Sequence, residues 1–361
     1  MYAIHEDIRI AQTLPGSFYS DSKVFDLLIA QVFEKSWQWM GEEKRLLPLE
    51  NSLYPTEFLQ TTVQEPLLLV KQKDGQIDCL SNVCTHRGNI LIPNPTIQKQ
   101  LICMYHGRRF ELNGKFKSMP EFQEALDFPR ACDSLQSFPL KNWNSHLFAG
   151  LNPSFDLQSV LNIMSERVGF LPIDSFSYNA ELSKDYLVNC HWALYCDNYL
   201  EGFHIPFVHK DLNEALDYGA YTTLLYDHMN LQIGYSSGGD EIFDLPEGHP
   251  DFGRSVSAYY YWIFPNMMFN FYPWGLSINI VKPIDINRTK VSFVSYIYDP
   301  SKMGQGMSAL IDKVEREDEF VVEGVQRGLK SKFYKSGRFS PSREKGVHQF
   351  QRLLSKYLSS E

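Results

Sequence analysis

What this 361-residue sequence has little of excludes several classes of protein. Its formal net charge is −9, without a notable basic patch, so nucleic acid is not expected as a partner. It has no run of about eighteen apolar residues, so no membrane-spanning segment is expected. The first residues lack the basic start and apolar run of a signal peptide. Six cysteines at this length do not form a disulfide framework, and we therefore expect a protein of the reducing cytoplasm.

The sequence also lacks a glycine-rich nucleotide-binding motif. No G-x-G-x-x-G opens a helix after a predicted strand. If the chain takes part in redox chemistry, we expect flavin and nicotinamide to bind a separate protein.

The clearest motif that is present runs from Cys84 to His106. Cys84 and His86 are two residues apart, Cys103 and His106 are three apart, and sixteen residues separate the two pairs. A tetrahedral zinc site accepts two cysteines and two histidines. A Rieske [2Fe–2S] centre also takes two of each, with the histidines on one iron. The spacing favours the Rieske centre, because each loop offers one ligand of each kind, and zinc motifs usually keep like ligands together.

Strand and turn patterns divide the chain into three parts. Residues 37–153 contain short apolar segments and two hairpin turns, Asp74-Gly75 and Asn113-Gly114, which predict an all-β module with the Cys84 and Cys103 loops after strands. Residues 154–361 mix strands with helices, including a long helix predicted over 308–330, and indicate an α+β domain. Residues 1–36 form an N-terminal segment that packs on this domain, with a helix expected over 22–39.

A second group of ligand-type residues lies about a hundred residues after the first. Asp197, Glu201 and His204 are spaced at i, i+4 and i+7, which places them on one face of a helix. Pro206 interrupts that helix and lets His209 turn back toward the same point. Two histidines call for a carboxylate, because a 2-His-1-carboxylate triad binds Fe(II) and leaves open positions.

The best candidate for that carboxylate is Asp318. It falls within an apolar stripe of the long helix, formed by Ile311, Val314, Val321 and Val325. A lone acid in such a stripe needs a partner, either a metal ion or a buried polar group that it caps. The same stripe predicts that the neighbouring charged residues point elsewhere, namely Glu315, Arg316, Glu317 and Glu319.

These motifs resemble the Rieske non-haem iron oxygenase α subunits. The family's two catalytic motifs stand here as DNYLEGFHIPFVH and EDEFVVEGVQRGL, and its HRG follows the first cysteine. The resemblance covers nearly the whole chain. It implies an N-terminal β Rieske domain and a helix-grip catalytic domain, in which an antiparallel sheet is joined by a long C-terminal helix.

The resemblance also implies roles for individual residues. One [2Fe–2S] cluster is held by Cys84, His86, Cys103 and His106, and one mononuclear Fe(II) by His204, His209 and Asp318.

The remaining roles follow from the same resemblance. Glu201 stands where the family places the acid that bridges the two metal centres across a subunit interface, and Asn198 and Asp197 support the site. A homotrimer and a separate NAD(P)H-dependent reductase or ferredoxin are the expected partners. Two positions depart from the family pattern: Met104 replaces a proline, and Arg108 replaces a tryptophan, where we interpret it as altering the docking of an electron donor.

The function implied is an oxygenase that hydroxylates a C–H bond. Residues 259–274 are rich in tyrosine, phenylalanine and tryptophan, which either fill the core of a sheet or bind a quaternary ammonium by cation–π attraction. The pattern is most similar to oxygenases acting on choline, betaine and related N-methylated compounds. The alternatives are ring dioxygenation of an aromatic acid or, in another class, an electron carrier or a zinc-binding interaction protein. The second ligand set argues against that last class.

Overall fold

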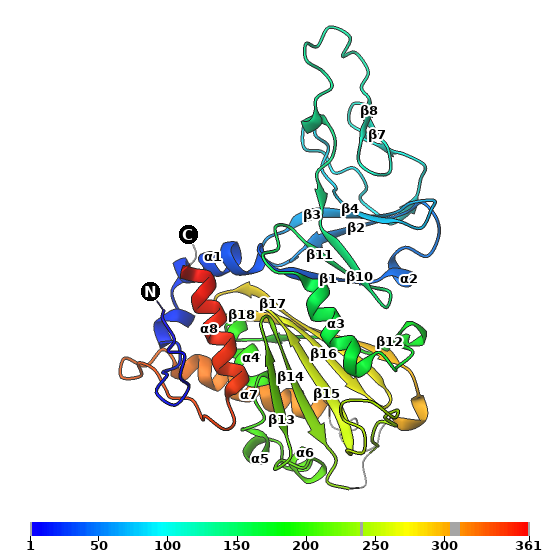
Figure 1. Ribbon diagram of the computed structural model, residues 1–361. Helices are drawn as coiled ribbons and strands as arrows, with labels where there is room; N and C mark the ends of the chain where they lie inside the picture. The colour runs from blue at the N-terminus through cyan, green and yellow to red at the C-terminus, as the bar shows by residue number, and fades with distance from the viewer. Residues whose placement is uncertain (1, 239–240, 304–310, 360–361) are drawn as a thin grey trace. The chain divides into compact units, whose positions relative to one another are not determined.

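The computed structural model describes residues 2–238, 241–303 and 311–359. The chain forms two compact units (Figure 1). The small unit comprises Glu34–Ser154, and the large unit comprises Met1–Phe33 and Phe155–Glu361.

The small unit is built from three antiparallel sheets. Their strand orders are β1-β11-β10, β5-β2-β3-β4-β9 and β6-β7-β8. The strands are β1 (Trp37–Glu42), β2 (Ser52–Phe58), β3 (Glu65–Lys71), β4 (Ile77–Ser81), β5 (Thr96–Ile97), β6 (Leu101–Ile102), β7 (Arg109–Phe110), β8 (Phe116–Ser118), β9 (Ser137–Phe138), β10 (Leu140–Trp143) and β11 (His146–Gly150), with short helices α2 (Glu43–Leu46) and η3 (Ala131–Asp133).

Both predicted hairpins of the small unit are present. Gly75 joins β3 to β4 with a φ of +88°, and Gly114 joins β7 to β8 with a φ of +83°, a region that favours glycine. Cys84 follows β4 and Cys103 follows β6, as predicted. Both thiols lie in the apolar core of the unit, so the sheets hold the two loops in place.

The large unit contains a seven-stranded antiparallel sheet in the order β12-β18-β17-β16-β15-β14-β13. Its central strands carry buried side chains on both faces, because helices cover the sheet. The strands are β12 (Ser177–Val188), β13 (Thr222–Tyr226), β14 (Met229–Tyr235), β15 (Val256–Ile263), β16 (Met267–Tyr272), β17 (Gly275–Asp285) and β18 (Arg288–Ile297).

Helices lie on both faces of this sheet. Figure 1 shows α3 in front of the strands and α7 behind them, and α4 contacts both α7 and β17. The helices are η1 (Gly16–Tyr19), α1 (Ser22–Leu28), η2 (Ile29–Phe33), α3 (Leu157–Val168), η4 (Ile173–Ser175), α4 (Trp192–Tyr199), α5 (Ile205–Val208), α6 (Lys210–Ala215), η5 (Pro300–Lys302), α7 (Ile311–Gly328) and α8 (Lys345–Ser359). The α+β prediction is confirmed. Within the described ranges, no helix is long and apolar enough to cross a bilayer.

The predicted end of the helix over 22–39 is wrong, and the end of the long helix lies two residues before the predicted one. The helix expected over 22–39 is regular only to Leu28, passes into the π-helical turn η2, and gives way to strand β1 at Trp37. The four-residue apolar repeat ends at Val32, and Trp37 to Trp39 then pair with β11 in the small unit. Helix α7 covers 311–328 where 308–330 was expected, and residues 308–310 lie outside the described part of the chain.

Candidate metal centres

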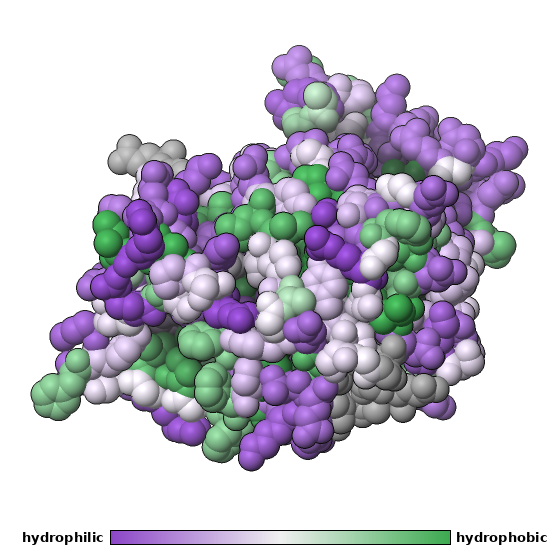
Figure 2. Space-filling model, turned by 60° about the horizontal axis from the view of Figure 1, so that its bottom comes forward, coloured by the Kyte–Doolittle hydropathy of each residue, from purple (hydrophilic) through white to green (hydrophobic). Residues whose placement is uncertain are grey.

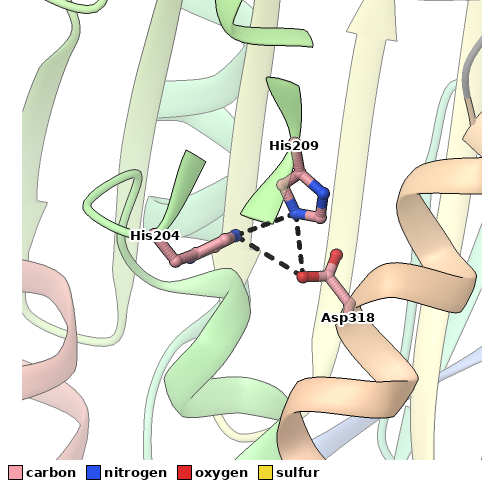
Figure 3. Close-up of side chains that lie close together, drawn as sticks. All are labelled: His204, His209 and Asp318. Atoms are coloured by element: carbon pink, nitrogen blue, oxygen red, sulfur yellow. Dashed lines mark hydrogen bonds and ion pairs between the residues drawn. The ribbon is translucent and has the colours of Figure 1, made fainter. Parts of the chain in front are cut away.

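His204, His209 and Asp318 meet at one point in the large unit (Figure 3). The Nε2 atoms of the two histidines are 3.1 Å apart, and Asp318 Oδ1 lies 3.0 Å from His209 Nε2 and 3.4 Å from His204 Nε2. Three ligand atoms at right angles around a metal, with bonds of about 2.1 Å, would be separated by about 3 Å. The donor set and its spacing therefore fit a facial triad with open positions for other ligands.

The local fold brings the two histidines together differently from the prediction. Helix α4 ends at Tyr199, so Glu201 and His204 lie beyond it and do not share a helix face with Asp197. Pro206 does not break a helix; it stands in the first turn of α5, where its missing N–H costs nothing. His204 and His209 flank this short helix at its two ends.

Each histidine is also held from behind by a carboxylate. His204 Nδ1 lies 2.7 Å from Glu201 Oε1, and His209 Nδ1 lies 2.7 Å from Glu317 Oε2. A carboxylate that accepts the Nδ1 proton fixes the tautomer, so that Nε2 carries the lone pair toward a metal. Burial lowers the pKa of His209, but its hydrogen bonds and ion pairs with Asp318 and Glu317 outweigh this and raise it.

The prediction that Glu315 and Glu317 point away from Asp318 is wrong. Glu317 contacts His209, and Glu315 is buried with only 5% of its surface exposed. Val325, assigned to the stripe, is 42% exposed, while Val322 and Gln326 are buried. The side chain of Ile311 lies outside the described part of the helix.

Asn198 and Asp197 have different environments. Asn198 donates from Nδ2 to Asp318 Oδ1 at 2.7 Å, and it therefore orients that carboxylate. Asp197 lies outside the group and accepts hydrogen bonds from Tyr19 and Gln351, joining α4 to the N-terminal segment and to α8. This contact is structural.

The buried Asp197 gives a prediction for stability against pH. Burial is the main cause that raises the pKa of its carboxyl to about 7, whereas the unfolded chain has the ordinary value of 3.8. The folded state therefore keeps a proton that the unfolded state releases, so this contribution to stability is lost as pH rises from about 4 to about 7. Asp197→Asn removes the titration. We expect the free energy of unfolding of the variant, relative to the parent, to rise by about 2.5 kcal/mol between pH 5 and pH 8.

Urea unfolding of both proteins at the two pH values checks this expectation. All other titrating groups are common to both proteins, so the change in the difference isolates Asp197. An equal difference at pH 5 and pH 8 would show that the carboxyl is ionised in the folded state throughout.

A cavity of about 150 Å³ opens onto the three-residue group. A cavity of about this volume holds a ligand the size of benzene. Six aromatic side chains line it, together with amide side chains and carboxylates: Tyr195, Tyr199, Tyr221, Tyr260, Tyr272, Phe293, Gln232, Asn270, Asn279, Glu201 and Glu315.

The aromatic segment 259–274 divides between the two roles considered for it. Tyr260 and Tyr272 line the cavity, and Tyr272 stacks on Trp274 with ring centroids 5.1 Å apart. The others are fully buried in β15, in β16 or in the turn between them: Tyr259, Tyr261, Trp262, Phe264, Phe269 and Phe271.

The small unit brings Cys84, His86, Cys103 and His106 together. The thiols are each 2% exposed, and the imidazole ring centroids lie 4.8 Å apart. Nδ1 of each imidazole is buried without a hydrogen-bond partner. Burial raises the pKa of Cys103, but backbone N–H groups and Cys84 outweigh this and lower it.

The two loops that carry these residues have the same backbone turn. Gly88 N–H donates to the carbonyl of Cys84, and Gly107 N–H donates to that of Cys103, both at 2.9 Å. Two buried thiols and two unpartnered ring nitrogens are the donors that a Rieske [2Fe–2S] cluster requires, so the residues fit this group.

The interpretation of Arg108 as a docking residue is wrong. Its side chain is 2% exposed and donates to Asp133 Oδ1 at 2.6 Å. Its guanidinium lies over the rings of Phe110, Phe116 and Phe128, at 4.9–5.7 Å from their centroids. It fills the space beneath the loops and offers nothing to a partner's surface.

Two family models match the chain. Residues 36–139 match the Rieske [2Fe-2S] domain, and residues 173–360 match the ring hydroxylating alpha subunit (catalytic domain). Among curated proteins, the chain is 28% identical to the chloroplastic choline monooxygenase of Arabidopsis thaliana, over 95% of this chain and 82% of that protein. It is 24% identical to the carnitine monooxygenase oxygenase subunit of Escherichia coli K12, over 96% and 93%.

Solved structures share the fold. The quaternary ammonium Rieske monooxygenase CntA with L-carnitine aligns with a TM-score of 0.75 at 22% identity, covering 97% of both chains. Naphthalene 1,2-dioxygenase from Rhodococcus sp. aligns with a TM-score of 0.74 at 15% identity, covering 97% of this chain and 95% of the other.

Proposed function

The chain belongs to the ring-hydroxylating α-subunit family of Rieske non-haem iron oxygenases, and we propose that it hydroxylates a methylated, quaternary ammonium substrate. As an α subunit of this family it is an oxidoreductase that incorporates oxygen from O₂, with a [2Fe–2S] cluster and a mononuclear iron. The observation that carries the substrate proposal is the tyrosine-lined cavity beside His204, His209 and Asp318.

The cavity suits a small organic cation. Tyr260 and Tyr272 meet edge to face with centroids 5.8 Å apart, and Tyr199 and Tyr221 complete the aromatic lining. Burial raises the pKa of Tyr199, Tyr221 and Tyr272 well above the ordinary value, so their phenols are neutral at physiological pH. Neutral aromatic faces attract a quaternary ammonium by cation–π interaction. The similarity to choline monooxygenase and to the carnitine monooxygenase oxygenase subunit supports the same substrate class.

Each site residue then has a role. Cys84, His86, Cys103 and His106 would hold the cluster, and the group of His204, His209 and Asp318 would hold the iron. When bound, these groups supply single-electron transfer and O₂ activation.

The protein's own contribution is positioning. Glu201 and Glu317 hold the Nδ1 protons of the histidines, and Asn198 orients Asp318. The tyrosines hold the ammonium group and exclude water from the reacting carbon. Hydroxylation of an N-methyl group consumes O₂, two electrons and two protons and gives water and an N-hydroxymethyl ammonium. This product breaks down to formaldehyde, the tertiary amine and a proton.

The two electrons would come from a separate NAD(P)H-dependent reductase or ferredoxin.

The oligomer would be a homotrimer, and exposed apolar residues near the two centres could form its contacts. Figure 2 brings forward the end of the large unit that carries α5 and α6 and shows hydrophobic residues among hydrophilic ones. Phe207 is 74% exposed beside His209, and Met104 and Tyr105 are 86% and 57% exposed beside His106. We infer that apolar residues beside each centre contact a neighbouring subunit.

We also propose that the chain divides into an N-terminal segment, a Rieske domain and a catalytic domain at the predicted limits of 1–36, 37–153 and 154–361. A reducing cytoplasm also remains the proposed compartment, because the four cysteines that are not proposed as cluster ligands are unpaired thiols: Cys79, Cys132, Cys190 and Cys196.

The test is reductase-coupled oxygen consumption over a panel of choline, glycine betaine, L-carnitine and benzoate, with formaldehyde and hydroxylated products quantified. We expect oxygen uptake matched by product only with methylated ammonium compounds.

Tyr260→Leu is expected to raise KM about tenfold for those compounds, because a desolvated cation–π contact is worth about 1–2 kcal/mol. An unchanged KM would show that Tyr260 does not contact the ammonium group. For the substrate panel, a single outcome decides. Turnover of benzoate alone would overturn the proposal.

A further inference from the structure

Glu315 places a carboxylate in the cavity wall. It lies on α7 one turn before Asp318, and both residues line the cavity. The Tyr195 hydroxyl lies 2.8 Å and 2.7 Å from the two Glu315 carboxylate oxygens and donates to this carboxylate. Glu315 and Tyr195 are each 5% exposed, so the carboxylate is held in a fixed place away from bulk solvent.

Negative charge predominates around this cavity. Three carboxylates line it, from Glu201, Glu315 and Asp318, and no lysine or arginine is among the lining residues in the described ranges. The acids Glu315 and Asp318 help raise the pKa of Tyr195, and Glu201 helps raise that of Tyr221, each in addition to burial. Electrostatic interactions are strong in such a low-dielectric space, and the carboxylate that Glu315 places in the cavity wall therefore favours a cationic ligand.

We propose that Glu315 is a specificity-determining residue that recognises the substrate's positive charge, and that the cavity selects a compact quaternary ammonium compound without a carboxylate. This inference rests on the proposed function and narrows it. A substrate with its own carboxylate would place that group in a cavity of about 150 Å³ that already holds carboxylates. Tyr195 is a positioning residue, because it acts through the Glu315 carboxylate.

The matched ligands for the test differ in charge and hardly in shape. Choline is a cation, 3,3-dimethyl-1-butanol is its neutral carbon analogue, and glycine betaine is the zwitterion. The iron-loaded holoenzyme is titrated with each compound, with tryptophan fluorescence as a measure of binding that does not depend on turnover. We expect choline to bind at least about tenfold more tightly than either of the others, because its positive charge is attracted to the Glu315 carboxylate in a low-dielectric cavity.

Glu315→Gln tests the residue itself. The amide keeps the size of the side chain and can still accept from Tyr195, but it carries no charge. We expect the Kd and KM of choline to rise at least about tenfold, with the Kd of 3,3-dimethyl-1-butanol unchanged and the iron content retained. Glu247→Gln, an exposed position outside the cavity, is the matched control and should change neither ligand's affinity.

The outcomes separate this inference from the proposed function. If the parent enzyme oxidises no methylated ammonium compound, the proposed function fails. If it oxidises glycine betaine or L-carnitine as well as choline, or if Glu315→Gln weakens choline and its neutral analogue equally, the role of Glu315 is overturned while the proposed function stands. Tyr195→Phe gives a second measurement should Glu315→Gln not fold. It keeps the charge and should weaken choline selectively by a smaller factor, and an equal effect on both ligands would overturn the inference.

Discussion

Replacing Asp318 with alanine is expected to abolish turnover and mononuclear iron binding while leaving the visible spectrum of the [2Fe–2S] cluster unchanged. The carboxylate supplies one of three ligand atoms, 3.0 Å and 3.4 Å from the two histidine nitrogens. Two imidazoles without an anionic ligand bind Fe(II) weakly, because carboxylates supply both charge and the third facial position. The four cluster ligands belong to the small unit and keep their own supporting contacts.

Iron analysis gives the quantitative form of this prediction. The parent should contain three iron atoms and two acid-labile sulfides per chain, and the variant should contain two of each. Asp285→Ala removes a carboxylate of the same kind from the end of β17, outside the three-residue group, and should keep all three irons. Loss of the cluster spectrum in Asp318→Ala, or retention of the third iron, would show that the ligand is assigned wrongly.

The residues proposed as ligands could be recognised in the sequence because most of them sit in short motifs. The spacing from Cys84 to His106 favours a Rieske centre over zinc through local chain geometry, and the second ligand group supports that choice. The same holds for His204 and His209, which flank a four-residue helix. The alternation of strands and turns likewise sufficed for the fold class.

The inward positions of Glu315 and Glu317 could not be predicted, although Glu201 was, because apolar periodicity indicates a different inward face for α7. The residues of α7 that are buried or line the cavity include Glu315, Asp318, Val322 and Gln326, so the inward face is largely polar. The valines beside this face favoured a different inward face in the sequence. Polar residues of α7 point inward because Glu315 contacts Tyr195 of α4 and Glu317 contacts His209 at the end of α5. Both partners are distant in sequence, so no local pattern reveals these contacts. A charged residue next to a predicted ligand was the only available signal for Glu317.

The end of α4 was missed for a related reason. An ideal helix continued through 197–204 places Asp197 beside Glu201, but the helix stops at Tyr199, and Gln351 and Tyr19 take the Asp197 carboxylate instead. Those contacts come from the two ends of the chain, so no local pattern could reveal them.

Glu201→Gln is expected to lower turnover by about 100-fold while both metal centres stay loaded. Glu201 Oε1 contacts His204 Nδ1 at 2.7 Å, and Oε2 accepts from the His204 backbone N–H at 3.1 Å. A glutamine can present its oxygen to only one of these donors, and it cannot stabilise positive charge that develops on the imidazole. Under the proposed trimer, the same carboxylate would also face the cluster histidines of the neighbouring subunit, so its loss should slow electron transfer in particular.

Rapid mixing separates this role from a loss of ligands. The reduced, iron-loaded enzyme is mixed with O₂ and choline, and the absorbance of the cluster reports its oxidation. In the parent the cluster should oxidise together with product formation, and in Glu201→Gln oxidation should be slower by the factor seen in turnover, with iron content and choline Kd unchanged. Glu247→Gln again serves as the control. If the cluster in Glu201→Gln oxidises at the parent rate, the Glu201 carboxylate is not needed for electron transfer between subunits. Glu201 would then only orient His204, and the electrons would pass through other residues.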